Sequence, residues 1–299
     1  MNHPPALGLA LLLPFLPLAI VGACSDDPNT SAGTGGTMSA TGSTGGTGGT
    51  PAGVGGASGG SGGMMGLGGS GGTGGSGGTG GAGGPSDLVA TFDFTGTDGS
   101  AWPPPWVDAG GVAIADLQGN RARLTPVTNV APYPLARMAL PASETNVELR
   151  FVVTFTNASQ QGLGFYARQN GGHLDLSMPP GAGYGVFIND SVSQALGLSL
   201  WVEQDGIESP LANTPVSLID GTPYHVTFRV EQQTPTETLL RARLWADGEV
   251  EPSGWMVQTT ATHSHLQQIA DGFAVDAYWA GGGSPGDLYL DDVLIQRLP

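Results

Sequence analysis

Gly, Ser, Thr and Ala make up nearly all of the chain from residue 31 to residue 84, a stretch that holds 28 of the 52 glycines. Such a composition cannot bury enough apolar surface to offset the entropy lost on folding, so it predicts a disordered linker over 24–85. A Gly-rich coil of this length spans on the order of 40–45 Å. A globular domain must therefore be built from residues 86–299.

The segment before the linker ends at the only cysteine of the chain, Cys24. Residues 7–20 are almost all apolar and have the length of a signal-peptide core, whereas Pro14 and Pro17 make them a poor membrane span. The four residues Val21-Gly22-Ala23-Cys24 resemble the lipobox of bacterial lipoprotein precursors, in which the leader is removed just before a cysteine that carries the lipid.

The lipobox resemblance implies a signal peptide over 1–23 and a lipid anchor at Cys24 that holds the protein at a membrane. Because Ser25 rather than Asp follows the cysteine, it also implies the outer membrane or cell surface. The alternative is ordinary secretory cleavage after Ala23, which would leave Cys24 as a free thiol.

The charge of residues 86–299 limits the partners of the domain. This region contains nine Arg, no Lys and 23 of the 25 carboxylates, so its net charge is 9 − 23 = −14. Such a field repels phosphate backbones and argues against nucleic acid as a partner. The region also lacks cysteine, so it can form neither a disulfide nor a Cys-based zinc site.

Short runs with an apolar period of two fill the region after Pro85, and Gly, Pro, Asn and Asp punctuate them. Alternation of this kind predicts half-buried strands joined by tight turns, and no stretch of helical period reaches three turns. The sequence therefore predicts an all-β, antiparallel sandwich or jelly roll. The clearest runs are 88–94, 147–155, 163–168, 184–188, 196–203, 224–231, 239–245, 273–279 and 288–295.

Several of these blocks carry a family resemblance, namely 92–94, 224–230, 240–245, 251–255 and 290–293. They resemble the concanavalin A-like lectin/glucanase (laminin G-like) jelly rolls. The resemblance implies two packed, curved antiparallel sheets, with any sugar site on the concave one. That superfamily includes hydrolases, lyases, lectins and spacers, so the fold alone does not choose among them.

Hydrolases of this superfamily carry their paired carboxylates in an E-x-D-x-(x)-E run on one strand, and the sequence has no such run. The closest pairs, Glu203 with Asp205 and Glu249 with Glu251, fall at predicted strand ends, where solvated carboxylates are common. His263 and His265 lack a third ligand at a recognisable spacing and are interpreted as surface residues. We therefore expect a domain without catalytic activity.

Strand parity selects the candidate ligand-binding residues, because successive side chains point to opposite faces. Once the apolar face of each run is assigned to the core, aromatic and hydrogen-bonding side chains remain on the other face, which suits a carbohydrate platform. Structural packing of the two Trp at the edge of the sandwich is the alternative. The candidates are Tyr166, Arg168, Trp201, Glu203, His225, Arg229, Arg241, Arg243 and Trp245.

Asp93 on the first predicted strand and Asp291 and Asp292 on the last are candidate calcium ligands. Sandwiches of the resembled family often pair the first and last strands and bind calcium, a hard cation that prefers oxygen ligands. Three carboxylates fall short of the six to eight oxygens that calcium usually takes, and capping of strand ends is the alternative.

Trp102-Pro103-Pro104-Pro105-Trp106 forms a stiff aromatic loop near the start of the domain. It is interpreted as a plug that covers the open end of the sandwich, with the rim of a binding site as the alternative.

Together these features predict a lipid-anchored outer-membrane or cell-surface protein whose β-sandwich binds polysaccharide without cleaving it. A structural or adhesive module that contacts another protein is the first alternative. A glycan hydrolase or lyase with an atypical site is the second.

Lipidation can be read directly from the mature amino terminus. Mass spectrometry of the protein isolated from membranes should show an acyl-modified Cys24 as the first residue. An unmodified Cys24 at the amino terminus would still agree with secretion of the protein but would contradict the lipid anchor.

Overall fold

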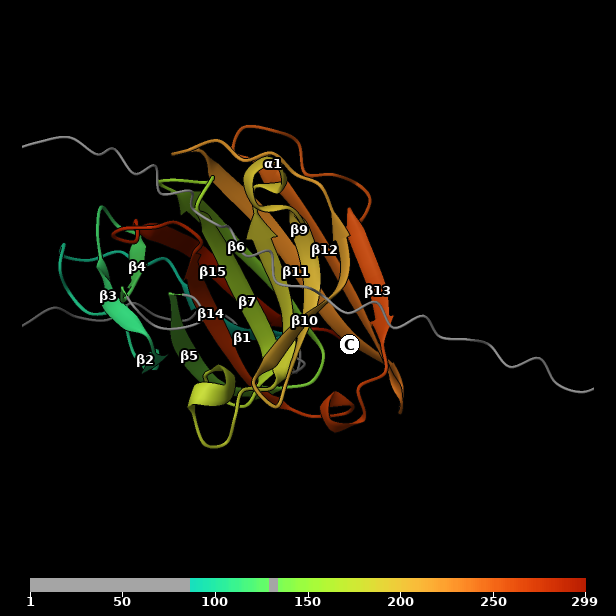
Figure 1. Cartoon of the computed structure of the whole chain (residues 1–299). Coiled ribbons are helices and arrows are strands. Elements are labelled where there is room, and N and C mark those ends of the chain that lie inside the picture. The colour runs from blue at the N-terminus through green and yellow to red at the C-terminus, as the bar shows by residue number, and fades with distance from the viewer. Residues whose placement is uncertain (1–86, 129–133) are drawn as a thin grey trace, which may run out of the picture. The chain divides into compact units, whose positions relative to one another are not determined.

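The computed structural model describes residues 87–128 and 134–299, which form two packed antiparallel β-sheets (Figure 1). The predicted all-β sandwich is confirmed. The predicted signal peptide, Cys24 and the 24–85 linker lie outside the described residues. Within the described part, no helix is both long enough and apolar enough to cross a membrane.

The first sheet has eight strands. In spatial order they are β13 (Val257–Ala261), β12 (Glu237–Ala246), β11 (Pro223–Thr234), β6 (Val147–Phe155), β15 (Leu288–Arg297), β4 (Ala122–Pro126) and β3 (Val112–Leu117), and β1 (Leu88–Phe92) also pairs with β15.

The second sheet has seven strands and carries the site described below. In spatial order they are β10 (Ile207–Thr214), β9 (Leu198–Gln204), β8 (Gly183–Asn189), β7 (Gln161–Gln169), β14 (Asp271–Trp279), β5 (Leu135–Glu144) and β2 (Val107–Gly110). The short helical elements are η1 (Leu174–Leu176), α1 (Ser191–Gln194) and η2 (Ser264–Leu266).

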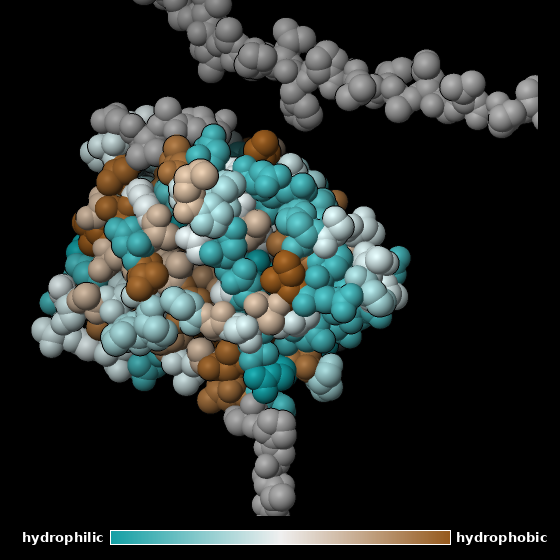
Figure 2. All heavy atoms as spheres, turned by 90° about the horizontal axis from the view of Figure 1, so that it is seen from below, coloured by the Kyte–Doolittle hydropathy of each residue, from teal (hydrophilic) through white to brown (hydrophobic). Residues whose placement is uncertain are grey.

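The core lies between the two sheets and follows the alternation of the sequence. On β7, Leu163, Phe165 and Ala167 are completely buried against the other sheet. Phe151 on β6 contacts Phe165 from the opposite sheet, with ring centroids 4.9 Å apart. At the surface seen in Figure 2, hydrophobic residues form separate patches among hydrophilic ones.

The Trp102–Trp106 loop packs into the core, which confirms its interpretation as a plug. Trp102 and Trp106 are 5% and 6% exposed, and their rings meet edge to face with centroids 5.3 Å apart. Trp106 also contacts Phe165, at 6.5 Å between centroids, and Trp102 donates from Nε1 to the carbonyl of Arg123 at 3.1 Å. The loop therefore closes the apolar interior.

Replacing Trp106 by Ala should lower the free energy of unfolding by about 3–5 kcal/mol, because it leaves a cavity among packed aromatic rings. Denaturant unfolding measures the loss. Trp245→Ala is the matched control, because that half-buried Trp lies on an outer face and should cost about 1 kcal/mol. Equal losses in both variants would contradict the plug.

Candidate functional site

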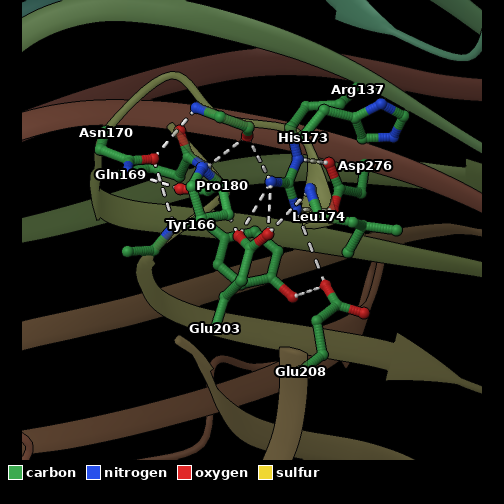
Figure 3. Close-up of polar contacts among 12 residues, drawn as sticks. Arg137, Tyr166, Gln169, Asn170, His173, Leu174, Pro180, Glu203, Glu208 and Asp276 are labelled. Carbon is green, nitrogen blue, oxygen red and sulfur yellow. Dashed lines mark hydrogen bonds and ion pairs between the residues drawn. The ribbon is translucent and has the colours of Figure 1, made fainter. Parts of the chain in front are cut away.

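A buried ion-pair cluster, whose polar contacts are drawn in Figure 3, lies on the second sheet. Its residues alternate along their strands with core residues such as Val202 and Val275, so they point away from the core. Its centre is Arg137 on β5, whose side chain is 0% exposed. Arg137 donates from Nε and Nη2 to the two carboxylate oxygens of Asp276 at 2.7 and 2.6 Å. The two residues are register partners on β5 and β14, so strand pairing itself brings the charges together.

The same guanidinium reaches two further elements. Its Nη1 donates to both carboxylate oxygens of Glu203 on β9, at 2.9 and 2.8 Å, and to the carbonyl of Gly172 at 2.7 Å. Two carboxylates around one buried cation satisfy most of its donors, as a buried charge requires. Because of these carboxylates, the pKa of Arg137 lies well above its usual value despite the opposing effect of burial.

Residues 170–182, which include η1, cover Glu203. The backbone N–H of Leu174 donates to Glu203 Oε1 at 3.1 Å. This close approach needs glycine at two positions. A Cβ on Gly181 would lie 1.9 Å from Glu203 Oε1, and a Cβ on Gly206, whose φ is +77°, would lie 2.3 Å from the carbonyl carbon of Leu174.

Glu208 on β10 completes the cluster. It is the register partner of Glu203, and Tyr166 on β7 donates its hydroxyl to Glu208 Oε1. Arg137 lies farther away, with 3.7 Å between Nη2 and Oε1. Burial and the charge of Asp276 raise the pKa of Glu208 to about 7, although the bond from Tyr166 opposes the shift. Burial also raises the pKa values of Glu203 and Tyr166.

A groove of about 610 Å³ lies beside this cluster on the same sheet face. Phe187 on β8, Trp201 on β9 and Tyr278 on β14 form its floor. Its walls come from the segments that flank the sheet: Leu174 and Asp175 of η1, Ile207 and Glu208 of β10, and Asn189, Ser193, Gln194 and Leu196 around α1.

Phe187 contacts each of the other two floor rings, and all three rings are half-buried. The ring centroid of Phe187 lies 5.4 Å from that of Trp201 and 6.0 Å from that of Tyr278. The indole of Trp201 is oriented by a hydrogen bond from Nε1 to Ser199 Oγ at 2.6 Å. Glu208 belongs both to the groove wall and to the ion-pair cluster, so the cluster contacts the groove through this carboxyl.

The predicted ligand-binding residues do not share one surface, and this part of the prediction is wrong. Tyr166, Trp201 and Glu203 point outward from the second sheet. The β11–β12 hairpin belongs to the first sheet, so its outward residues lie on the opposite side of the sandwich. Those residues are His225, Arg229, Arg241, Arg243 and Trp245.

Arg168 lies inside the sandwich rather than on its surface, which corrects its predicted orientation. Its φ of +52° and a register shift between β7 and β14 interrupt the alternation at this residue. The guanidinium is fully buried and donates to Thr238 Oγ1 at 2.9 Å and to the carbonyl of Leu266 at 2.7 Å. Burial lowers its pKa to about 10.

On the first sheet, the outward arginines form a surface cluster around Trp255. The guanidinium carbons of Arg229, Arg241 and Arg243 lie 5.4, 5.1 and 4.8 Å from the centroid of that ring. Each arginine also pairs with a carboxylate, from Glu148, Glu231 and Glu251 respectively. His225 stacks on Trp245 with centroids 5.4 Å apart. The positive charges of these arginines are therefore already paired with carboxylates of the protein itself.

On the second sheet, only Trp201 of the predicted residues lines the groove. Tyr166 and Glu203 are 1% and 0% exposed beneath their neighbours. Phe187 and Tyr278 were not among the predicted residues, although strand parity places both on the outward face of predicted strands. Glu208 had no such signal, because Pro210 interrupts the alternation of β10.

The carboxylates predicted to bind calcium do not form a metal-binding group. β1 does pair with β15, with Phe92 opposite Val293, and this brings Asp93 near Asp291. Among residues 87–128 and 134–299, however, no group of three or more His, Cys, Asp or Glu side chains could hold a metal ion. Calcium binding therefore remains a prediction without geometric support.

The comparisons with known proteins do not assign a family to this chain. No family model and no curated protein matches the chain. The chain is similar to a variant of the alginate lyase Aly36B in complex with alginate trisaccharide, with 14% identity and a TM-score of 0.46 over 72% of this chain and 99% of that one.

Two other solved structures give similar values. The carbohydrate-binding module CBM66 from Bacillus subtilis has 12% identity and a TM-score of 0.43 over 64% of this chain and 95% of that chain. The CBM2 module of the evolved Dit of Lactobacillus casei BL23 phage J-1 has 14% identity and a TM-score of 0.47 over 72% and 97%. At these identities and TM-scores, the likeness does not assign a function to the groove.

The raised pKa of Glu208 predicts a pH dependence of stability. Because the folded state favours protonated Glu208, this stabilisation is complete below the usual pKa of 4.5 and is lost as the pH rises through about 7. Between pH 4.5 and 8, the free energy of unfolding of the unmodified protein should fall relative to that of Glu208→Gln by on the order of 2–3 kcal/mol. Glu237→Gln, an exposed carboxylate on β12, should parallel the unmodified protein. Parallel curves for Glu208→Gln and the unmodified protein would contradict the assignment.

Proposed function

We propose that the domain binds polysaccharide in the groove without cleaving it, and that a lipid on Cys24 anchors the protein at the outer membrane or cell surface. The observation that carries the binding proposal is the continuous floor of three aromatic rings, Phe187, Trp201 and Tyr278. Flat aromatic faces pack against the C–H faces of sugar rings, and the cavity volume lies within the range of ligand sites, about 300–1,000 Å³.

The walls supply groups that suit sugar hydroxyls. The carboxylates of Asp175 and Glu208 accept hydrogen bonds, while the amides of Asn189 and Gln194 both donate and accept them. Ile207 is 67% exposed at the same wall, so part of the rim is apolar. A few polar groups around an aromatic floor are typical of a binding groove.

The proposal that the domain does not cleave its ligand rests on the carboxylates of the cluster. Glycoside hydrolysis needs two carboxyl groups that face the scissile bond from either side. Glu203 and Asp276 are fully engaged by Arg137 and almost completely buried, so they do not face the groove. The two carboxyls that do line it, Glu208 and Asp175, come from adjacent segments rather than from opposite sides, since the backbone of Asp175 lies against Gly206.

A glycan lyase or hydrolase is the second candidate, and one observation favours it. Glu208 has a pKa of about 7 and bonds to the hydroxyl of Tyr166, and a carboxyl of that pKa is suited to proton transfer near neutral pH. Release of oligosaccharides from a bound polymer would establish this candidate.

The test is retention of the 24–299 chain, made soluble by Cys24→Ser, on a polysaccharide array. Trp201→Ala should weaken glycan binding about tenfold or more, because it removes one of the three rings of the floor, and it should leave the fold intact. Trp245→Ala on the opposite sheet is the matched control and should bind normally. Retention on no glycan would contradict carbohydrate binding and favour a structural or adhesive module.

A further inference from the structure

We propose that the groove selects uncharged polysaccharides and rejects polymers of uronic acids. This proposal rests on the glycan-binding function proposed above and names the ligand class of that same groove. It follows from where the chain places its cations and its carboxylates.

Every side-chain cation that could bind a carboxylate of the ligand is used elsewhere. The chain has no Lys, and all nine of its Arg lie among the described residues, yet none of them lines the groove. Arg137 is the nearest to it, and that side chain is completely buried and bonded to Asp276 and Glu203.

The other eight arginines are held away from the groove by their own contacts. Arg168 is buried inside the sandwich. Four form ion pairs with carboxylates on the outer face of the first sheet, one lies over a tyrosine ring, and two form ion pairs with carboxylates on neighbouring or opposite strands. These are Arg150, Arg229, Arg241 and Arg243, then Arg121 over Tyr289, then Arg123 with Asp116 and Arg297 with Glu144.

The groove wall carries carboxylates instead. Asp175 is exposed on η1, and the side chain of Glu208 is 22% exposed on β10. Behind Glu208, one cation, Arg137, faces Glu203, Glu208 and Asp276, so the cluster has excess negative charge when all three are ionised. A uronate entering the groove would meet like charges and lose hydration without gaining a cation.

Neutral sugars can bind favourably to the same carboxylate oxygens of Asp175 and Glu208. Their hydroxyls donate hydrogen bonds, and ionised carboxylates are acceptors that form charge-assisted bonds with them. The aromatic floor packs against sugar rings whether or not the polymer is charged. The charge of the walls, rather than the floor, therefore sets the selectivity.

The experiment compares each polymer with its own acidic form. Binding of the 24–299 Cys24→Ser chain to a soluble β-glucan, a β-mannan and a β-galactan is measured before and after oxidation of their primary hydroxyls to carboxylates. Measurements are made at pH 8, above the pKa of Glu208. Methyl esterification of the oxidised polymers separates charge from size, because the ester retains the added atoms without the charge.

At least one neutral polymer should bind, its oxidised form should bind at least tenfold more weakly, and the ester should recover most of the affinity. The double variant Asp175→Asn/Glu208→Gln should reduce the difference between the oxidised polymer and its ester, whereas Glu237→Gln should leave it unchanged. Raising the salt concentration should also reduce the difference, because it screens exposed charges.

Equal or tighter binding of an oxidised polymer would overturn the selectivity and leave glycan binding intact. A weakened oxidised form whose ester binds no better would also overturn it, because size rather than charge would then be the cause. Failure of every polymer to bind in either form would contradict the glycan-binding function itself, and the selectivity would fall with it.

Discussion

The guanidinium of Arg137 is the interaction on which the second sheet and its groove depend. It joins Asp276 on β14 to Glu203 on β9, and through the carbonyl of Gly172 it also holds the segment that contains η1. Removing one member of such a buried set leaves the remaining charges without compensation, which is far more destabilising than the net gain from forming the set. The wall of the groove is therefore fixed by electrostatics as much as by apolar packing.

The charge balance of this cluster also determines the chemistry of the groove. One cation cannot neutralise three carboxylates, and Arg137 makes its short contacts to Asp276 and Glu203. Glu208 accepts a hydrogen bond from the hydroxyl of Tyr166 instead, and burial, followed by the charge of Asp276, raises its pKa. A buried ion-pair cluster thus influences the carboxyl that lines the groove without itself being exposed.

Sequence reasoning was most successful where strands alternate regularly. The all-β class, the strands 147–155 and 224–231, and the plug formed by Trp102 and Trp106 follow from parity and composition. Parity shows which face of a strand a residue occupies but not which sheet the strand belongs to. It therefore assigned residues of β9 to the same surface as residues of β11 and β12, which lie in the other sheet.

The misplacement of Arg168 has a different cause. A positive φ and a bulge change the direction of a side chain without any signal in the residue pattern. The Arg137 cluster was also beyond reach, because it joins residues 66 and 139 positions apart and needs the 170–182 segment to bury it. Contacts of this range depend on the order of the strands, which spacing along the sequence does not determine.

The floor of the groove also has a consequence for how this protein can vary. The ring of Phe187 lies over Gly162, where an added Cβ would approach it to 2.6 Å, and the ring of Tyr166 lies over Gly185, where the distance would be 2.7 Å. Alanine at Gly162 would push the ring of Phe187 outward and make the groove shallower, whereas alanine at Gly185 would displace Tyr166 and its bond to Glu208. Homologues that retain this groove should therefore accept changes along its walls, at positions such as 175 and 207, and almost no change at Gly162 and Gly185.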